Sequence, residues 1–119
     1  VLALAGCGVG ALPCGRLAAA LRHSGLACLD LSSNETGDEG AWELAWGLAE
    51  SGITDLRLAV NEIEEDGAAE LLAALESSPL LEALDLRGNR IDPTSATGAA
   101  LAARAGVNLN FQTKPRAAM

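Results

Sequence analysis

Hydrophobic residues follow a six-residue pattern that recurs along the chain. A leucine, any residue, a second leucine, two further residues and an asparagine occupy positions 29–34, 56–61 and 84–89, at offsets of 27 and 28 residues. Positions 2–7 carry the same pattern with Cys7 in place of the asparagine. Alternating apolar and variable positions are typical of a strand with one buried face. The pattern therefore predicts a short strand at the start of each repeat.

Each predicted strand is followed by leucines with helical spacing. Leucines four residues apart lie on one face of a helix, and such pairs occur at Leu17 and Leu21, Leu44 and Leu48, and Leu71 and Leu75. In the last full repeat Ser95 stands in the place of Gly67, alanines 99 and 103 replace the leucines, and Pro93 intervenes. We expect this last helix to begin late, because proline is poorly tolerated inside a helix.

The repeats predict a single domain, which also suits a chain of 119 residues. We expect a repeat domain over residues 1–111, with repeats at about 1–25, 26–52, 53–80 and 81–106 and a closing strand at 107–111. The closing strand is one residue short of the pattern and is expected to be a terminal cap. A basic tail follows at 112–119.

The repeat resembles the leucine-rich repeat family, whose consensus is LxxLxLxxN/CxL. Leu26, Ile53 and Leu81 occupy the leading position, and Ile63 and Ile91 the closing one. The repeat length and the helical leucines are similar to the ribonuclease-inhibitor-like class. The resemblance implies an α/β solenoid: a short right-handed horseshoe arc with a parallel β-sheet on its concave face and α-helices on its convex face. Such a solenoid offers surfaces to proteins rather than an enclosed pocket for a cofactor or substrate.

The asparagines of the pattern have an expected structural role. Each leaves its strand at a sharp bend, where backbone N–H and C=O groups would otherwise be unpaired inside the stack. An asparagine amide both donates and accepts, so a ladder formed by Asn34, Asn61 and Asn89 is expected to hold the bends of neighbouring repeats. Cys7 takes the first ladder position, at the end of the stack.

Charge is concentrated in the middle of the chain. The net charge is −8, and fifteen of the 16 acidic residues lie between positions 30 and 85, where Arg57 is the one basic residue. Nucleic acids and anionic lipid surfaces need a basic surface, so this balance argues against both as partners. The uncharged first fifteen residues belong to the repeat and fall short of the roughly 18 apolar residues of a membrane span, which argues against direct membrane insertion.

Cysteine and histidine are too sparse to predict a metal site or an active site. Cys7, Cys14 and Cys28 form no CxxC motif, and His23 is the only histidine. We therefore expect no metal, no cofactor and no catalytic residues. Sparse, unpaired cysteines fit reducing intracellular surroundings, in the cytoplasm or inside an organelle if a targeting segment was removed.

Outward-facing strand positions provide the first candidate surface. The central residue between the two leucines points away from the core, which assigns one row across the sheet to Ala3, Asp30, Arg57, Asp85 and Asn110. Arg87 lies diagonal to this row. The alternating charges form either a polar strip that binds a partner or a self-neutralised row that keeps neighbouring strands in register.

Acidic residues crowd the loops between strands and helices and provide the second candidate surface, which consists of Glu35, Asp38, Glu39, Glu62, Glu64, Glu65 and Asp66. An acidic rim of this kind would steer a partner with a basic surface. The alternative is that the carboxylates complement the helix N-termini, although seven exceed what two helices require.

The only two tryptophans provide the third candidate surface. Trp42 and Trp46 are four residues apart on the predicted second helix, beside the leucine stripe, and their counterparts one repeat later are Ala69 and Ala73. Small neighbours leave room for the indoles to lie between helices. An exposed pair would instead anchor a partner on the convex face. The sequence leaves both interpretations open.

The favoured function is a non-catalytic protein–protein interaction module or scaffold. Four repeats with two open ends indicate either an accessory subunit of a larger assembly or a fragment of a longer repeat array. The family resemblance adds two alternatives, a GTPase activator similar to the Ran GTPase-activating proteins and the repeat segment of an innate-immune sensor. Arg90 is the residue to test for the first, which the short array and the basic tail disfavour.

Overall fold

Among the described residues of the computed structural model, five short parallel strands form one sheet. They are β1 (Leu2–Ala3), β2 (Cys28–Asp30), β3 (Asp55–Arg57), β4 (Ala83–Asp85) and β5 (Val107–Asn108), and they lie in sequence order. Leu29 pairs with Leu56, and Leu56 with Leu84, so equivalent leucines of successive repeats stand side by side. The repeat length therefore sets the register of the sheet.

The structure describes residues 2–8, 10, 14, 16–17, 20, 25–48, 51–78, 80–110 and 112–113. Several residues named above lie outside this part of the chain, namely Leu21, His23, Phe111 and the basic residues of the tail.

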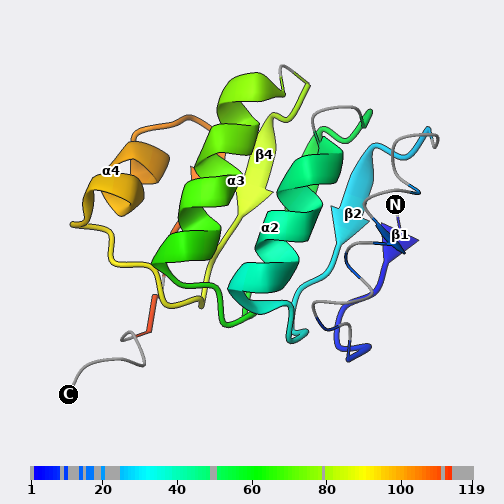
Figure 1. Ribbon diagram of the computed structural model, residues 1–119, viewed down its shortest axis with the longest axis horizontal. Helices are drawn as coiled ribbons and strands as arrows, with labels where there is room; N and C mark the ends of the chain where they lie inside the picture. The colour runs from blue at the N-terminus through cyan, green and yellow to red at the C-terminus, as the bar shows by residue number, and fades with distance from the viewer. Residues whose placement is uncertain are drawn as a thin grey trace.

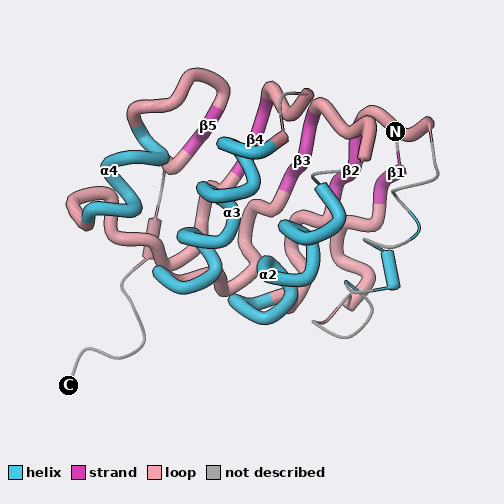
Figure 2. Tube along the Cα trace, turned by 45° about the horizontal axis from the view of Figure 1, so that its top comes forward, coloured by secondary structure: helices cyan, strands magenta, loops and turns pink. Residues whose placement is uncertain are grey.

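Three described helices cover one face of the sheet: α2 (Gly37–Leu48), α3 (Glu65–Ser77) and α4 (Ala96–Ala102). Figures 1 and 2 show them side by side on the same side of the strands. Each strand leads through a helix to the neighbouring parallel strand, so the chain builds a solenoid of strand–helix units. This architecture confirms the predicted α/β solenoid.

The hydrophobic core lies between the sheet and the helix layer. Leu29, Leu56 and Leu58 point into it from the strand segments and are fully buried. Leu44 and Leu71 reach it from α2 and α3 and are also fully buried. Because each repeat contributes leucines to both layers, the apolar side of one unit is covered by the next.

The last repeat differs from the others in its helix. α4 begins 31 residues after α3, compared with 28 residues between α2 and α3, which confirms the late start. Ser95 caps α4 by accepting a hydrogen bond from the backbone N–H of Gly98, and Gly98 and Leu101 are buried. The predicted alignment of Ser95 with Gly67 is therefore wrong, because the shift of three residues restores a buried glycine and leucine to the helix.

The closing strand β5 places Asn108 in the central row of the sheet. Asn108 pairs with Asp85, and Val107 pairs with Leu84. The assignment of Asn110 to that row is therefore wrong. The last repeat is shorter than the others because α4 has only 7 residues, so the next strand arrives earlier than the repeat length predicts.

Asparagine amides connect the bends of neighbouring repeats. Nδ2 of Asn61 donates to the carbonyl of Leu31 at 2.8 Å, and its Oδ1 accepts the backbone N–H of Thr36 at 3.3 Å. Oδ1 of Asn89 in turn accepts the N–H of Asn61 at 2.8 Å and that of Ile63 at 3.0 Å. Asn61 and Asn89 are completely buried, so these bonds replace water at the bends.

The ends of this ladder differ in chemistry. At the first repeat, Nδ2 of Asn34 donates to the carbonyl of Leu4 at 2.9 Å, and the exposed Cys7 thiol donates to the carbonyl of Ala5 at 3.7 Å. At the other end, Gln112 donates to the carbonyl of Leu86 at 2.6 Å, and its Oε1 accepts the backbone N–H of residue 91 at 2.9 Å. Gln112 thus takes the ladder position of the closing strand. The interpretation of that strand as one residue short is wrong, because a glutamine carries the same amide as an asparagine.

The residue before each ladder position adopts a left-handed backbone conformation. The φ angles are 67° at Gly6, 58° at Ser33, 55° at Val60 and 70° at Gly88. Glycine takes this conformation freely, whereas a β-branched residue is strained there. Val60, which is 53% exposed, is therefore a strained position at the surface of the third repeat.

Candidate protein-binding surfaces

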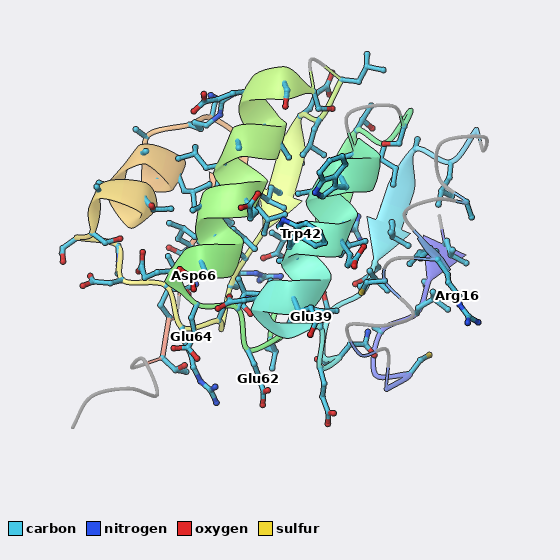
Figure 3. All side chains as sticks on the ribbon, in the orientation of Figure 1. Arg16, Glu39, Trp42, Glu62, Glu64 and Asp66 are labelled. Carbon is cyan, nitrogen blue, oxygen red and sulfur yellow. The ribbon has the colours of Figure 1, made fainter. Side chains whose placement is uncertain are left out.

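Two tryptophans stand on the outer side of α2. Trp42 is 43% exposed and Trp46 is 70% exposed. Their ring centroids are 5.9 Å apart and the ring planes meet at 66°, an edge-to-face arrangement. Figure 3 shows Trp42 on the side of α2 that faces away from the sheet. The indoles are therefore not enclosed between the helices.

A groove of about 340 Å³ lies between the two indoles and α3. Its lining consists of Trp42, Ala45 and Trp46 from α2 and of Glu70, Ala73, Ala74 and Ser77 from α3. The α3 side of the groove therefore has small side chains and one carboxylate. Small residues on α3 leave the indoles uncovered, which a larger residue at position 73 would prevent.

The outer helices are acidic throughout. α2 carries Asp38, Glu39 and Glu43, and α3 carries Glu65, Asp66, Glu70 and Glu76. Neither helix contains a lysine or an arginine. The helical face of the molecule therefore combines an apolar groove with an unbalanced negative charge.

Asp38, one residue of the predicted acidic rim, is bound to the neighbouring repeat. Its Oδ1 accepts the backbone N–H of Glu64 at 2.7 Å and that of Gly67 at 3.0 Å, in the first turn of α3. These N–H groups have no partner inside their own helix. The Asp38 carboxylate therefore completes the N-terminus of α3, as the alternative interpretation of the rim expected for helix starts.

Glu65 binds the next repeat in the same manner. Its Oε1 accepts the backbone N–H of Asp92 at 2.8 Å, and its Oε2 accepts the hydroxyl of Ser95, the cap of α4, at 2.9 Å. Asp38 and Glu65 stand 27 residues apart, at equivalent repeat positions. Sequence reasoning did not identify this repeated contact, although the shared position of two acids was a signal for it.

The other rim residues remain toward solvent. Glu64 forms an ion pair of 3.9 Å with Arg90, and both side chains are partly buried. Glu35, Glu39, Glu62 and Asp66 are exposed. Figure 3 shows Glu39, Glu62, Glu64 and Asp66 along one edge of the molecule, where the strands lead into the helices.

The concave face of the sheet holds Asp30, Arg57 and Asp85 in register. The two aspartates turn along their own strands, because Oδ1 of each accepts the backbone N–H two residues later, at 3.0 and 3.1 Å. The described ion pairs of this face also run along strands, from Arg57 to Asp55 at 3.2 Å and from Arg87 to Asp85 at 2.8 Å. Neutralisation therefore occurs within each strand rather than across the row.

Both ion pairs keep their charges firmly. Burial acts to raise the pKa of Asp85, but hydrogen bonds from Arg87 and its positive charge lower that pKa below its usual value. The hydrogen bond to Asp55 raises the pKa of Arg57. Asp55 was not a sequence-based candidate, although its position two residues before Arg57 on the same strand face was a usable signal. These residues surround a shallow hollow of about 190 Å³.

Reactive groups of the kind that catalysis needs are not assembled in the described part of the chain. Cys14 is fully buried, and burial, followed by the charge of Glu43, raises its pKa to about 11. Its thiol is therefore protonated at neutral pH. The described residues contain no cluster of three or more histidine, cysteine or acidic side chains that could hold a metal ion. None of the described helices has the length and hydrophobicity of a membrane-crossing helix.

Comparisons with known proteins agree with this architecture. The model of the leucine-rich repeat family matches residues 26–45 and 77–97. Among solved structures, leiomodin-1 actin-binding site 2 is similar in fold, with a TM-score of 0.76 and 19% identity over 94% of this chain and 69% of that chain. A search of curated protein sequences finds no match. The family match, the shared fold and the in-register repeats together identify the chain as a member of the leucine-rich repeat family.

Proposed function

We propose that this chain is a non-catalytic protein-interaction module, and that the outer face of α2 and α3 binds a partner with a basic surface. The observation that carries the proposal is Trp46, an indole that is 70% exposed beside a second exposed indole. Exposing so large an apolar ring to water is unfavourable, and covering it with a partner recovers that free energy. Tryptophan is also among the residues that contribute most binding energy in protein interfaces.

The surrounding charge supports a basic partner. α2 and α3 carry seven acidic residues between them and no basic residue, and two of the seven, Asp38 and Glu65, are bound to the neighbouring repeat. The remaining carboxylates would attract a positively charged surface and repel an acidic one. The concave face is a weaker choice, because Arg57 and Arg87 are already paired and exposed ion pairs contribute little.

We further propose that the chain is of the ribonuclease-inhibitor-like class and acts as an accessory subunit of a larger intracellular assembly. The support for the class is the length of α2 and α3, with 12 and 13 residues in repeats of 27 and 28. A permanent partner would keep both indoles covered. Likeness to leiomodin-1 actin-binding site 2 is a likeness of fold, so the partner is argued from the surface rather than from that name.

Native size tests the proposal. The tagged chain is expressed in its source, and extracts are separated by size-exclusion chromatography with immunodetection. We expect elution far above 12.1 kDa, and release toward the free size when Trp42 and Trp46 are both changed to alanine. The matched control changes Arg57 and Arg87 to alanine and should leave the elution unchanged. Release by the control and not by the tryptophan variant would contradict the proposal.

A further inference from the structure

We infer that the groove between α2 and α3 binds an amphipathic helix of the partner, with one lysine or arginine lying across the indoles toward Glu70. The inference rests on the proposed function, because it specifies the ligand of the same face. Three properties of the groove carry it: the geometry of the indole pair, the lining of the groove and the state of the surrounding backbone.

The geometry of the indole pair leaves aromatic surface available. In an edge-to-face pair the edge of one ring meets the face of the other, so the remaining ring faces stay open. Trp42 and Trp46 have this arrangement, at 66° and 5.9 Å, and 70% of Trp46 is exposed. The open face of an indole attracts a cation, and tryptophan does so more strongly than other aromatic residues.

The lining of the groove suits a long cationic side chain. Ala45, Ala73 and Ala74 provide small apolar contacts, and Glu70 provides the carboxylate. Lysine and arginine have apolar stems that pack on such surfaces while their charged ends reach a polar group. A volume of about 340 Å³ accommodates one such side chain together with its apolar neighbours on a helix. An acidic or purely apolar ligand would leave Glu70 without a partner.

The backbone around the groove favours a helical ligand over an extended one. The groove lies between two helices, whose backbone N–H and C=O groups are bonded within each helix. An extended peptide would find no backbone partners there and would lose its hydrogen bonds to water. A helix satisfies its own backbone and packs its side chains between the ridges of two others.

The chain carries its own probe for this ligand. Trp42 and Trp46 are its only tryptophans and it has no tyrosine, so intrinsic fluorescence reports on the groove alone. The purified chain is titrated with a tryptophan-free leucine–lysine peptide of about 18 residues, which is about five helical turns. The matched control peptide has glutamate in place of every lysine. We expect a saturable shift of the emission to shorter wavelength with the lysine peptide and no shift with the glutamate peptide.

A pair of variants tests the role of Glu70. Glu70→Gln removes the carboxylate of the groove, whereas Glu76→Gln removes the same charge from α3 outside the groove lining. We expect Glu70→Gln to weaken binding of the lysine peptide by about fivefold and Glu76→Gln by less than about twofold. Equal weakening by both variants would overturn the inference, since it would show attraction by net charge alone.

Two results separate the inference from the proposed function. Equal shifts with both peptides, or no shift with the lysine peptide, overturn the cationic-helix ligand. If the tryptophan variant still leaves the native assembly in that case, the face binds a partner of other chemistry and the proposed function stands. If the tryptophan variant stays in the assembly, the proposed function fails together with the inference.

Discussion

The carboxylate of Asp38 accepts a hydrogen bond of 3.0 Å from the backbone N–H of Gly67, which joins the second repeat to the helix of the third. A Cβ atom added at Gly67 would lie 2.5 Å from that same carboxylate oxygen. The glycine is therefore required by the close approach of the carboxylate. Glu65 and Ser95 repeat the contact one unit later, at 2.9 Å.

Replacing Asp38 with alanine should destabilise the solenoid. The change leaves two N–H groups of the first turn of α3 without their acceptor, which is comparable to the loss of a helix cap and costs about 1 kcal/mol, within a range of roughly 0.5–2. Urea unfolding followed by circular dichroism measures the effect. Asp66→Ala, on the exposed side of the same turn, is the control and should change the free energy of unfolding by less than about 0.5 kcal/mol. Equal effects would exclude the capping role of Asp38.

Replacing Asn61 with alanine should have a larger effect. The completely buried amide serves the carbonyl of Leu31 and the N–H of Thr36, and its loss leaves buried groups unpaired. We expect a loss of about 1–3 kcal/mol in a chemical melt. Asn110→Ala, at an exposed position, is the matched control. An unchanged melt for Asn61→Ala would refute the ladder.

Relieving the strain at Val60 should stabilise the chain. Its φ of 55° is unfavourable for a β-branched side chain, whereas asparagine tolerates this conformation. Val60→Asn is expected to raise the free energy of unfolding by about 1 kcal/mol. Val60→Ile keeps the β-branch and should give no gain. A gain with isoleucine but not with asparagine would show that apolar contact at this position outweighs the strain.

Acid should weaken the concave face through Asp85. Because Arg87 lowers its pKa in the folded chain, this group contributes stability above the ordinary carboxylate pKa of 3.8, and loses it as the pH falls through the lowered value. The difference in unfolding free energy between wild type and Asp85→Asn should therefore be larger at pH 7 than at about pH 2. Urea melts at both pH values measure it. In an Arg87→Met background the pH dependence of this difference should shrink, and its persistence would show that Arg87 is not the cause.

The three cysteines should differ in reactivity. The thiol of Cys14 is buried with a pKa of about 11, whereas Cys7 is exposed. Iodoacetamide at about pH 8 should modify Cys7 in the native chain and leave Cys14 intact until urea unfolds the protein. Mass spectrometry of the peptides measures the rates. Equal native rates would show that the first repeat opens readily around Cys14.

The fold was predictable from the sequence because the repeat itself encodes the register. Once Leu29, Leu56 and Leu84 are recognised as equivalent, strand order and pairing follow. Contacts between side chains and backbone were less accessible. The bonds of Asp38 depend on how close two helices lie, and the closing position of the ladder was hidden because Gln112 replaces an asparagine.

The surfaces were predictable only in part. The tryptophan pair was identifiable as a rare residue type at helical spacing, but its exposure depends on the small residues that α3 places opposite it. The central row of the sheet was placed by register, except at its end, where the short α4 brings in Asn108 early. The sequence did not reveal that Asp30 and Asp85 turn along their strands, because the backbone N–H groups that draw them there belong to the bend.

Hydroxyl-radical footprinting of the chain, free and within its native assembly, tests the binding face most directly. Oxidation of Trp42 and Trp46, read by mass spectrometry, should fall strongly in the assembly, while the concave segment around Arg57 remains as accessible as in the free chain. Equal oxidation of both indoles in the two states, with protection of the concave segment instead, would contradict binding through the helical face.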